Sequence, residues 1–134
     1  MFMLVASLAA AAATAAAPRS ESDRVKAVIF TQVKLFKQGR YRAMYDTTIT
    51  PRFRATCSWP KYLRAQRALR RFLGDRFTLR GVRVRMLSRT RALLAYRFVR
   101  ANGRVAGETK FGDRDIYVKV GRRWLDEFDR VSGC

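Results

Sequence analysis

The 134-residue chain contains no histidine, only two cysteines and only three prolines. The absence of histidine removes every mechanism that uses an imidazole base, and it removes the commonest metal ligand. Two distant cysteines are too few to build a zinc site, so no metal and no cofactor is expected. Glycine-rich phosphate loops and serine nucleophile motifs are missing as well. The function classes left are acid–base enzymes, binding domains and proteins that bind charged surfaces.

Acidic residues are scarce, since ten Asp and Glu stand against 29 Lys and Arg, and the formal net charge is +19. A field of this sign attracts anionic partners, polyanions and lipid headgroup surfaces. Recognition of nucleic acid needs exposed aromatic residues along a defined basic groove, and the sequence shows neither, so nucleic acid is not an expected partner. Hydrophobic residues make up 49% of the chain, which excludes a disordered protein and predicts one domain of this length.

The apolar run at the N-terminus is too short to span a bilayer comfortably, because a spanning helix needs about 20 residues. Residues 2–17 carry no charge and end in small residues before Pro18. We interpret residues 1–17 as a signal peptide and residues 18–22 as a linker, which predicts export to the periplasm, cell envelope or medium. The basic stretch that should open a signal peptide is absent. An uncleaved membrane tether and an Ala-rich tail therefore remain as alternatives.

Two cysteines are an even number in a chain that we expect to be exported. A disulfide between Cys57 and Cys134 is predicted on this ground, with two unpaired thiols as the alternative. It would join the C-terminal tail, residues 131–134, to the domain, residues 23–130. Closing so long a loop would stabilise the fold by about 4 kcal/mol in the chain-entropy model.

Hydrophobic residues recur at helical spacing in the first part of the domain. A helix is predicted to begin near Ser22 or Asp23 and to end at Gly39, and a short second helix follows over residues 40–46. We expect Pro51 to interrupt the chain after it. The apolar face of the first helix contains Val25, Val28, Ile29, Gln32, Val33 and Phe36.

A third helix is predicted between Ser58, as its N-cap, and Gly74, where it ends. Pro60 is tolerated in the first turn, because its missing N–H has no helical partner there. The expected apolar stripe of this helix consists of Tyr62, Ala65, Leu69 and Phe72.

The hydrophobic period then changes from helical to two, which predicts β-strands. They are expected over residues 82–86 (with 77–79 as an extension), 91–100, 114–120 and 123–128. Asn102-Gly103 predicts a type I′ hairpin turn. In the third of these strands Ile116, Val118 and Val120 lie on one side, and Tyr117 and Lys119 on the other. Helices followed by an antiparallel meander define an α+β fold.

Three stretches resemble the NTF2-like superfamily, which includes ketosteroid isomerase and the SnoaL-like cyclases. They are Phe36-Lys37-Gln38-Gly39-Arg40-Tyr41-Arg42-Ala43-Met44-Tyr45, Thr50-Pro51-Arg52-Phe53-Arg54 and Asp115-Ile116-Tyr117-Val118-Lys119-Val120-Gly121-Arg122-Arg123-Trp124. The resemblance implies a cone, in which a curved antiparallel sheet wraps around the N-terminal helices and leaves an apolar pocket at the open end. It implies no single activity, because the fold hosts enzymes and plain binders.

Three functions are considered on this basis. The leading one is non-enzymatic binding of a small apolar ligand or a partner protein, through a pocket lined by Tyr45, Trp59, Tyr62, Tyr96, Phe98 and Trp124. The second is an isomerase, dehydratase or cyclase, for which Asp46 is the weak catalytic candidate; the other acids are expected to neutralise part of the arginine excess. The third is a basic binder of polyanions or membrane surfaces through Arg83, Arg85 and Lys119 on the outer face of the sheet. Relatives often dimerise through that face, so a homodimer is a further option.

Overall fold

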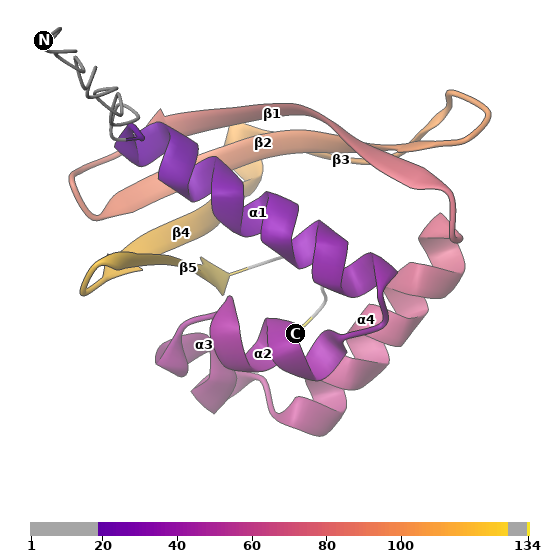
Figure 1. Ribbon diagram of the computed structural model, residues 1–134, viewed down its shortest axis with the longest axis horizontal. Coiled ribbons are helices and arrows are strands. Elements are labelled where there is room, and N and C mark those ends of the chain that lie inside the picture. The colour runs from indigo at the N-terminus through magenta and orange to yellow at the C-terminus, as the bar shows by residue number, and fades with distance from the viewer. Residues whose placement is uncertain (1–18, 129–133) are drawn as a thin grey trace, which may run out of the picture.

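The computed structural model describes residues 19–128 and Cys134, which form an α+β fold (Figure 1). The predicted signal peptide and residues 131–133 of the predicted tail lie outside the described residues. The helices are α1 (Glu21–Lys37), α2 (Tyr41–Thr47), α3 (Pro51–Thr56) and α4 (Trp59–Leu73). The strands are β1 (Phe77–Met86), β2 (Arg91–Arg100), β3 (Val105–Thr109), β4 (Asp115–Val120) and β5 (Arg123–Phe128), with a short 3-10 helix η1 (Phe111–Asp113) before β4. The predicted α+β class is confirmed.

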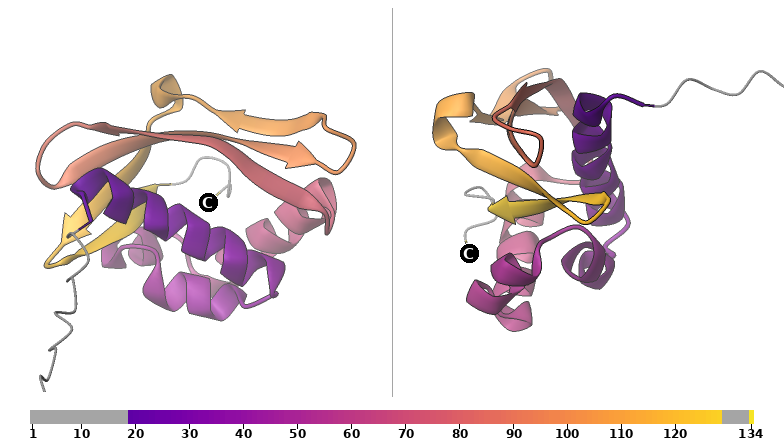
Figure 2. Two further views of the ribbon diagram at one scale, coloured as in Figure 1. Left: turned by 45° about the horizontal axis from the view of Figure 1, so that its top comes forward. Right: turned by 90° about the vertical axis from the view of Figure 1, so that its left-hand side faces the viewer.

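The five strands form one open antiparallel sheet in the order β1-β2-β4-β5, and β3 pairs with β2 as well. Two strands pair with the same edge of β2: β4 pairs with residues 91–94, and β3 pairs with residues 96–99. A bulge interrupts β1 between Arg80 and Arg83, where Gly81 has a φ of 63°. Glycine adopts this left-handed conformation without strain, and the bulge bends the strand. The helices lie on one side of the resulting curved sheet (Figure 2).

The first helix begins slightly earlier than predicted. Ser20 is the N-cap of α1, and its hydroxyl accepts a hydrogen bond of 3.1 Å from the Asp23 backbone N–H. Residues 21 and 22 therefore belong to the helix and not to a linker. The predicted end is confirmed, since Gly39 follows the helix with a φ of 70°.

A short helix, α3, occurs where the sequence predicts only a break. Pro51 occupies its first turn, and the Thr50 hydroxyl accepts a hydrogen bond of 3.0 Å from the Phe53 backbone N–H. Proline is well suited to this position, because its fixed φ matches the helix and the missing N–H needs no partner there. The predicted break of the second helix before Pro51 is confirmed, whereas the helix that begins at Pro51 was not predicted.

The bounds of α4 agree with the prediction, but its buried face does not. Ser58 is the N-cap residue and Gly74 follows the last turn with a φ of 74°, although the Ser58 side chain makes no capping hydrogen bond. Phe72, placed on the apolar stripe, is 56% exposed. Gln66 is buried in its place, at 3% exposure. The buried face of α4 therefore contains Gln66 and Leu73 in place of Phe72.

The two faces of the sheet are fixed by the pairing registers. Residues of β4 and β5 that point toward α1 are Asp115, Tyr117, Lys119, Trp124 and Asp126; we call this side the inner face. Lys119 pairs with Trp124, and Tyr117 with Asp126. The apolar set of Ile116, Val118 and Val120 therefore lies on the outer face, on the same side as Arg83 and Arg85.

The hairpin between β2 and β3 turns back at the predicted place, but through a different turn. Gly103 has a φ of 81°, whereas Asn102 is not among the residues with positive φ. A type I′ turn needs positive φ at both central residues, so that assignment was wrong. The Asn102 side chain instead accepts a hydrogen bond of 2.9 Å from the Arg104 backbone N–H.

A disulfide joins Cys57, the residue that follows α3, to Cys134. Cys57 directly follows α3 and is 1% exposed, within a hydrophobic cluster that includes Tyr45, Phe53 and Tyr62. The Tyr45 hydroxyl donates a hydrogen bond of 2.8 Å to the Cys57 carbonyl oxygen. The predicted bridge is confirmed, and the alternative of two free thiols is excluded.

Candidate functional site

A small cavity lies between the helices and the inner face of the sheet. Its volume is about 50 Å³. One water molecule needs about 10–15 Å³ measured in this way, so the cavity has room for a few water molecules or a small organic molecule. Most of the wall is apolar. The apolar and aromatic lining residues are Ile29, Val33, Phe36, Met44, Ile49, Phe53, Tyr62, Leu69, Leu73, Phe77, Tyr96, Phe98 and Tyr117, and the polar ones are Gln32, Gln66 and Asp126.

One polar part of the wall is a hydrogen-bonded group of three side chains from α1, β4 and β5. The Tyr117 hydroxyl donates to Gln32 Oε1 at 2.9 Å, and Gln32 Nε2 donates to Asp126 Oδ2 at 3.2 Å. Gln32 Nε2 also lies 3.3 Å from the Thr48 hydroxyl oxygen. Tyr117 is 1% exposed and Asp126 is 2% exposed. A buried carboxyl group therefore lies on the mostly apolar wall of the cavity.

The backbone holds Asp126 rigidly at this position. Residues 48–50, between α2 and α3, run parallel to β5 and form a bridge between Ile49 and Asp126. The Asp126 N–H donates to the Thr48 carbonyl at 2.8 Å, and the Thr50 N–H donates to the Asp126 carbonyl at 2.9 Å. Because the N–H and C=O groups of Asp126 are both hydrogen-bonded, the position of its Cα atom, from which the side chain extends, is fixed.

A second polar position on the wall comes from α4. The Gln66 side chain lines the cavity and is 3% exposed. A polar group fixed on an apolar cavity wall can orient a small molecule inside the cavity. The Gln66 amide can both donate and accept.

Three of the six predicted pocket residues do line the cavity, namely Tyr62, Tyr96 and Phe98. The Tyr96 hydroxyl donates a hydrogen bond of 2.8 Å to Asp115 Oδ2, and Asp115 is 2% exposed. Asp115 and Asp126 thus lie inside the fold. The sequence predicts only that these acids neutralise part of the arginine excess, and it does not place them on the inner face of the sheet.

The other three predicted pocket residues are placed elsewhere. Tyr45 lies in the hydrophobic cluster beside the disulfide, and its ring contacts the Trp59 ring at a centroid distance of 5.4 Å. The Arg42 guanidinium lies 4.9 Å from the centre of the Trp59 ring. Trp124 packs at the beginning of α1. These aromatic rings support the core and do not border the cavity.

Asp46, the weak catalytic candidate, is a surface residue. It is exposed near the end of α2 and accepts a hydrogen bond of 3.1 Å from Arg42 Nε, one helical turn earlier. Such an exposed i, i+4 pair contributes only about 0.3–0.5 kcal/mol to stability. Asp46 has no contact with the cavity wall, so the structure gives it no catalytic role.

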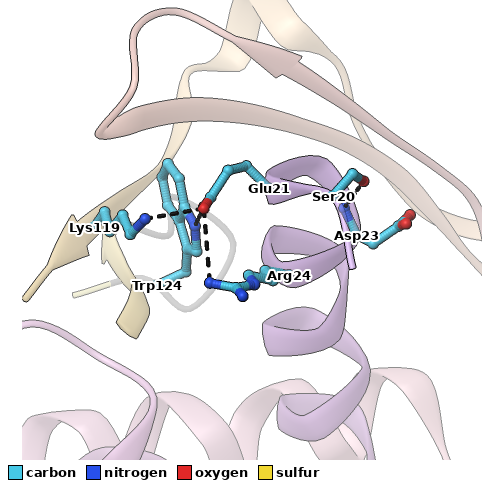
Figure 3. A network of polar contacts seen from close by, with 6 residues as sticks. All are labelled: Ser20, Glu21, Asp23, Arg24, Lys119 and Trp124. Carbon is cyan, nitrogen blue, oxygen red and sulfur yellow. Dashed lines mark hydrogen bonds and ion pairs between the residues drawn. The ribbon is translucent and has the colours of Figure 1, made fainter. Parts of the chain in front are cut away.

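The beginning of α1 is fastened to the sheet through Glu21 (Figure 3). Glu21 Oε2 accepts a hydrogen bond of 2.6 Å from the Trp124 indole N–H, and Oε1 accepts one of 3.0 Å from Lys119. Arg24 lies 3.7 Å away on the same helix. The hydrogen bond from Trp124, followed by that from Lys119, holds the pKa of Glu21 below its ordinary value.

The predicted basic surface is only partly assembled. Arg83 and Arg85 lie together on the outer face, where their guanidinium groups are 5.2 and 4.6 Å from the centre of the Phe111 ring. Lys119 does not join them. Its ammonium group is bound to Glu21 on the inner face. Lys119 and Tyr117 are two positions apart on β4 and therefore point to the same side of the sheet, whereas Val118 points to the other side.

Two glutamines within apolar helix faces are a sequence signal for the polar wall. Gln32 lies within the apolar face of α1, and Gln66 lies four residues after Tyr62 on α4. A glutamine that interrupts a buried helical stripe needs a polar partner, which indicates a polar site in the core. Asp126 carried no comparable signal, because alternation in β5 does not show which side faces the helices.

No family model, no curated protein and no solved structure matches the chain. Among residues 19–128, no helix has the length and apolar character needed to cross a membrane. The same residues contain no group of three or more Cys, Asp or Glu side chains arranged to hold a metal ion.

Proposed function

We propose that this protein is an NTF2-like domain that binds a small organic molecule in its internal cavity. The observation that carries the proposal is the pair of buried polar side chains, Gln66 and Asp126, on an apolar wall. Binding sites for small molecules typically combine such walls with a few fixed polar groups, which orient the ligand. The carboxylate accepts hydrogen bonds and the amide both accepts and donates. The ligand therefore has an apolar body and at least one hydroxyl or N–H group.

The size of the cavity restricts the ligand further. Pockets for drug-sized molecules measure about 300–1,000 Å³, whereas this one measures about 50 Å³. A molecule of about four heavy atoms fits without any rearrangement, since each water-sized group needs about 10–15 Å³. Larger ligands would require the side chains of α4 to move.

The order of elements supports the family assignment. A long helix, a glycine, a short helix and a helix that begins at Pro51 precede the sheet, and Gly121 separates the last two strands. The bulge at Gly81 bends the sheet around α1, as a cone requires. Export is part of the same proposal. It is supported by the disulfide, since such bonds persist mainly in oxidising compartments.

Two probes of equal size test the binding proposal. 2-Propanol and acetone have the same number of heavy atoms, but only the alcohol donates a hydrogen bond. We expect backbone amide shifts in an NMR titration to move at residues around the cavity, with tighter binding of 2-propanol. In Asp126→Asn the ratio of the affinity for 2-propanol to that for acetone should fall about fivefold, because one hydrogen bond is worth about 1 kcal/mol and the new amide can donate to acetone.

Two further variants control this experiment. Val33→Ile adds one methylene to the cavity wall and should weaken both probes, whereas Arg67→Gln, on the exposed face of α4, should change neither. Binding that is unaffected by Val33→Ile would place the probes elsewhere and refute the proposal. So would equal affinities for the two probes in the parent protein and in Asp126→Asn.

The buried carboxylate favours acid–base chemistry as a second candidate function. Asp126 could take a proton from the carbon next to a ketone carbonyl, while the Gln66 amide donates a hydrogen bond to the enolate oxygen that keeps the electron pair. Return of a deuteron from solvent would complete an exchange reaction. We expect deuterium incorporation into acetone to be faster with the protein than with Asp126→Asn. Equal rates would remove this candidate and leave the binding proposal untouched.

A further inference from the structure

Two β-hairpins end side by side at the end of the molecule where α1 begins (Figures 1 and 2). One is the turn between β1 and β2, residues 87–90, and the other is the turn between β4 and β5, residues 121–122. A backbone hydrogen bond of 2.8 Å from the Lys119 N–H to the Thr90 carbonyl ties them together. We call residues 85–91 and 120–123 the hairpin end.

Large apolar side chains are exposed at this end. Met86 is 37% exposed, Leu87 is 45% exposed and Val120 is 46% exposed. Val120 is the last residue of β4, directly before its turn, and Leu87 is the first residue of the β1–β2 turn. Scattered exposed apolar residues need no explanation. These three, however, all lie at the ends of two joined hairpins, where they can enter another apolar phase together when the tips approach it end-on.

The same tips are strongly basic. The two segments carry five exposed arginines and no acidic residue. These are Arg85, Arg89, Arg91, Arg122 and Arg123. Lys119, next to them, is neutralised by Glu21. An apolar tip surrounded by arginines is the pattern of a surface that rests in the interface of an anionic bilayer, because long basic side chains reach the headgroups while apolar ones enter the acyl boundary.

The chain enters the fold at this end as well. Glu21, at the first position of α1, is bound to Lys119 and Trp124 next to the β4–β5 turn (Figure 3). The described part of the chain therefore enters the fold beside the hairpin end.

We propose that the hairpin end docks on anionic lipid bilayers, with Leu87, Met86 and Val120 at the level of the acyl boundary and the arginines among the headgroup phosphates. A nucleic acid or an acidic protein would also attract the arginines, but neither accounts for apolar side chains at the tips. The proposal does not depend on the cavity or on its ligand.

Binding of the full chain to phosphatidylcholine vesicles, with and without phosphatidylglycerol, tests the proposal by co-sedimentation. The tip variant is Leu87→Ser combined with Arg89→Gln and Arg122→Gln. Its matched control is at the opposite end of the molecule, where Val105 is 54% exposed: Val105→Ser combined with Arg104→Gln and Arg71→Gln. Both sets remove two cations and one exposed apolar side chain.

Each cation near the surface is worth about 1 kcal/mol, or about fivefold in affinity, so the loss of two arginines alone should weaken binding to anionic vesicles about 25-fold. The loss of Leu87 should weaken it further. The control should lose less than about fivefold, because its cations lie far from the lipid on the scale of the Debye length of about 8–10 Å. Equal losses in the two variants would overturn the proposal, since binding would then depend on net charge alone.

Two other results would also overturn it. If the parent protein bound neutral and anionic vesicles equally, the apolar residues 2–17 and not the arginines would account for the association. If Leu87→Ser alone left vesicle binding unchanged, the tips would not enter the bilayer, and a soluble polyanion would be the ligand of the arginines. Binding to heparin, measured for the same single variant, should by contrast remain unchanged.

Discussion

Reduction of the disulfide between Cys57 and Cys134 should cost the protein a large part of its stability. The two cysteines are separated by 77 positions in the sequence. In the chain-entropy model a loop of this length reduces the entropy of the unfolded chain by about 15 cal/mol/K, which is about 4.5 kcal/mol at room temperature. Domains of this size have total stabilities of about 5–15 kcal/mol, so this one bond decides whether the fold is well populated.

The measurement is urea unfolding of the oxidised protein, of the reduced protein and of Cys134→Ser. Cys134 is exposed, whereas Cys57 is 1% exposed. The variant therefore opens the loop without changing a core side chain, and it should match the reduced parent protein. The melting temperature should fall by about 15–20 °C, because one kcal/mol corresponds to about 4 °C in a domain of this size.

The slope of unfolding free energy against urea distinguishes the mechanism. Opening the loop lets the unfolded chain expand and expose more surface, so the slope should increase in both the reduced protein and Cys134→Ser. A loss of stability below about 1 kcal/mol would refute the reasoning, because it lies outside the typical range of about 2–4 kcal/mol for a native bridge. A large loss in the reduced protein but not in Cys134→Ser would assign the effect to the reductant.

Two further predictions concern polar groups of α1. Because the folded-state pKa of Glu21 is lowered, its contribution to stability is complete above the ordinary value of 4.5 and is lost as the pH falls through the folded-state pKa. Urea midpoints measured across this range should decline less steeply in Glu21→Gln, and an identical decline would show that the Trp124 indole does not stabilise the carboxylate. Gln32→Leu removes the amide that donates to the buried Asp126 carboxylate, and should destabilise the fold by about 2–3 kcal/mol in urea unfolding. Gln38→Leu, at an exposed position after the same helix, should have little effect, and equal losses at the two positions would contradict the role of the buried network.

Local signals in the sequence were sufficient to predict most helices and strands. The run of apolar residues in the middle of residues 91–100 predicted β2 with its correct bounds, and Ser58 with Gly74 predicted those of α4. Such signals can be read from the sequence because caps and turns satisfy backbone N–H and C=O groups through residues that are close along the chain. The helix at Pro51 was missed because proline both ends one helix and begins another, and only the Thr50 cap distinguishes the two cases.

The orientation of the strands could not be predicted in this way. Period-two alternation separates two faces of β4 but does not show which of them packs on the helices. The more apolar set, Ile116 and Val118, lies on the outer face, while Asp115 and Tyr117 face inward. Long-range contacts decide this, since Tyr117 binds Gln32 on α1. The polar wall of the cavity therefore became visible only in three dimensions, although Gln32 already interrupted an apolar face.

The most direct test of the binding proposal is a crystal structure of the protein soaked in 2-propanol. We predict one alcohol molecule inside the cavity between α1, α4 and the sheet, with its methyl groups against Phe98 and Leu69. Its hydroxyl should lie within about 3 Å of Asp126 or Gln66, the ordinary length of such a hydrogen bond. A cavity closed by its own side chains, with 2-propanol bound only on the surface, would contradict the proposal that this fold holds a small polar ligand.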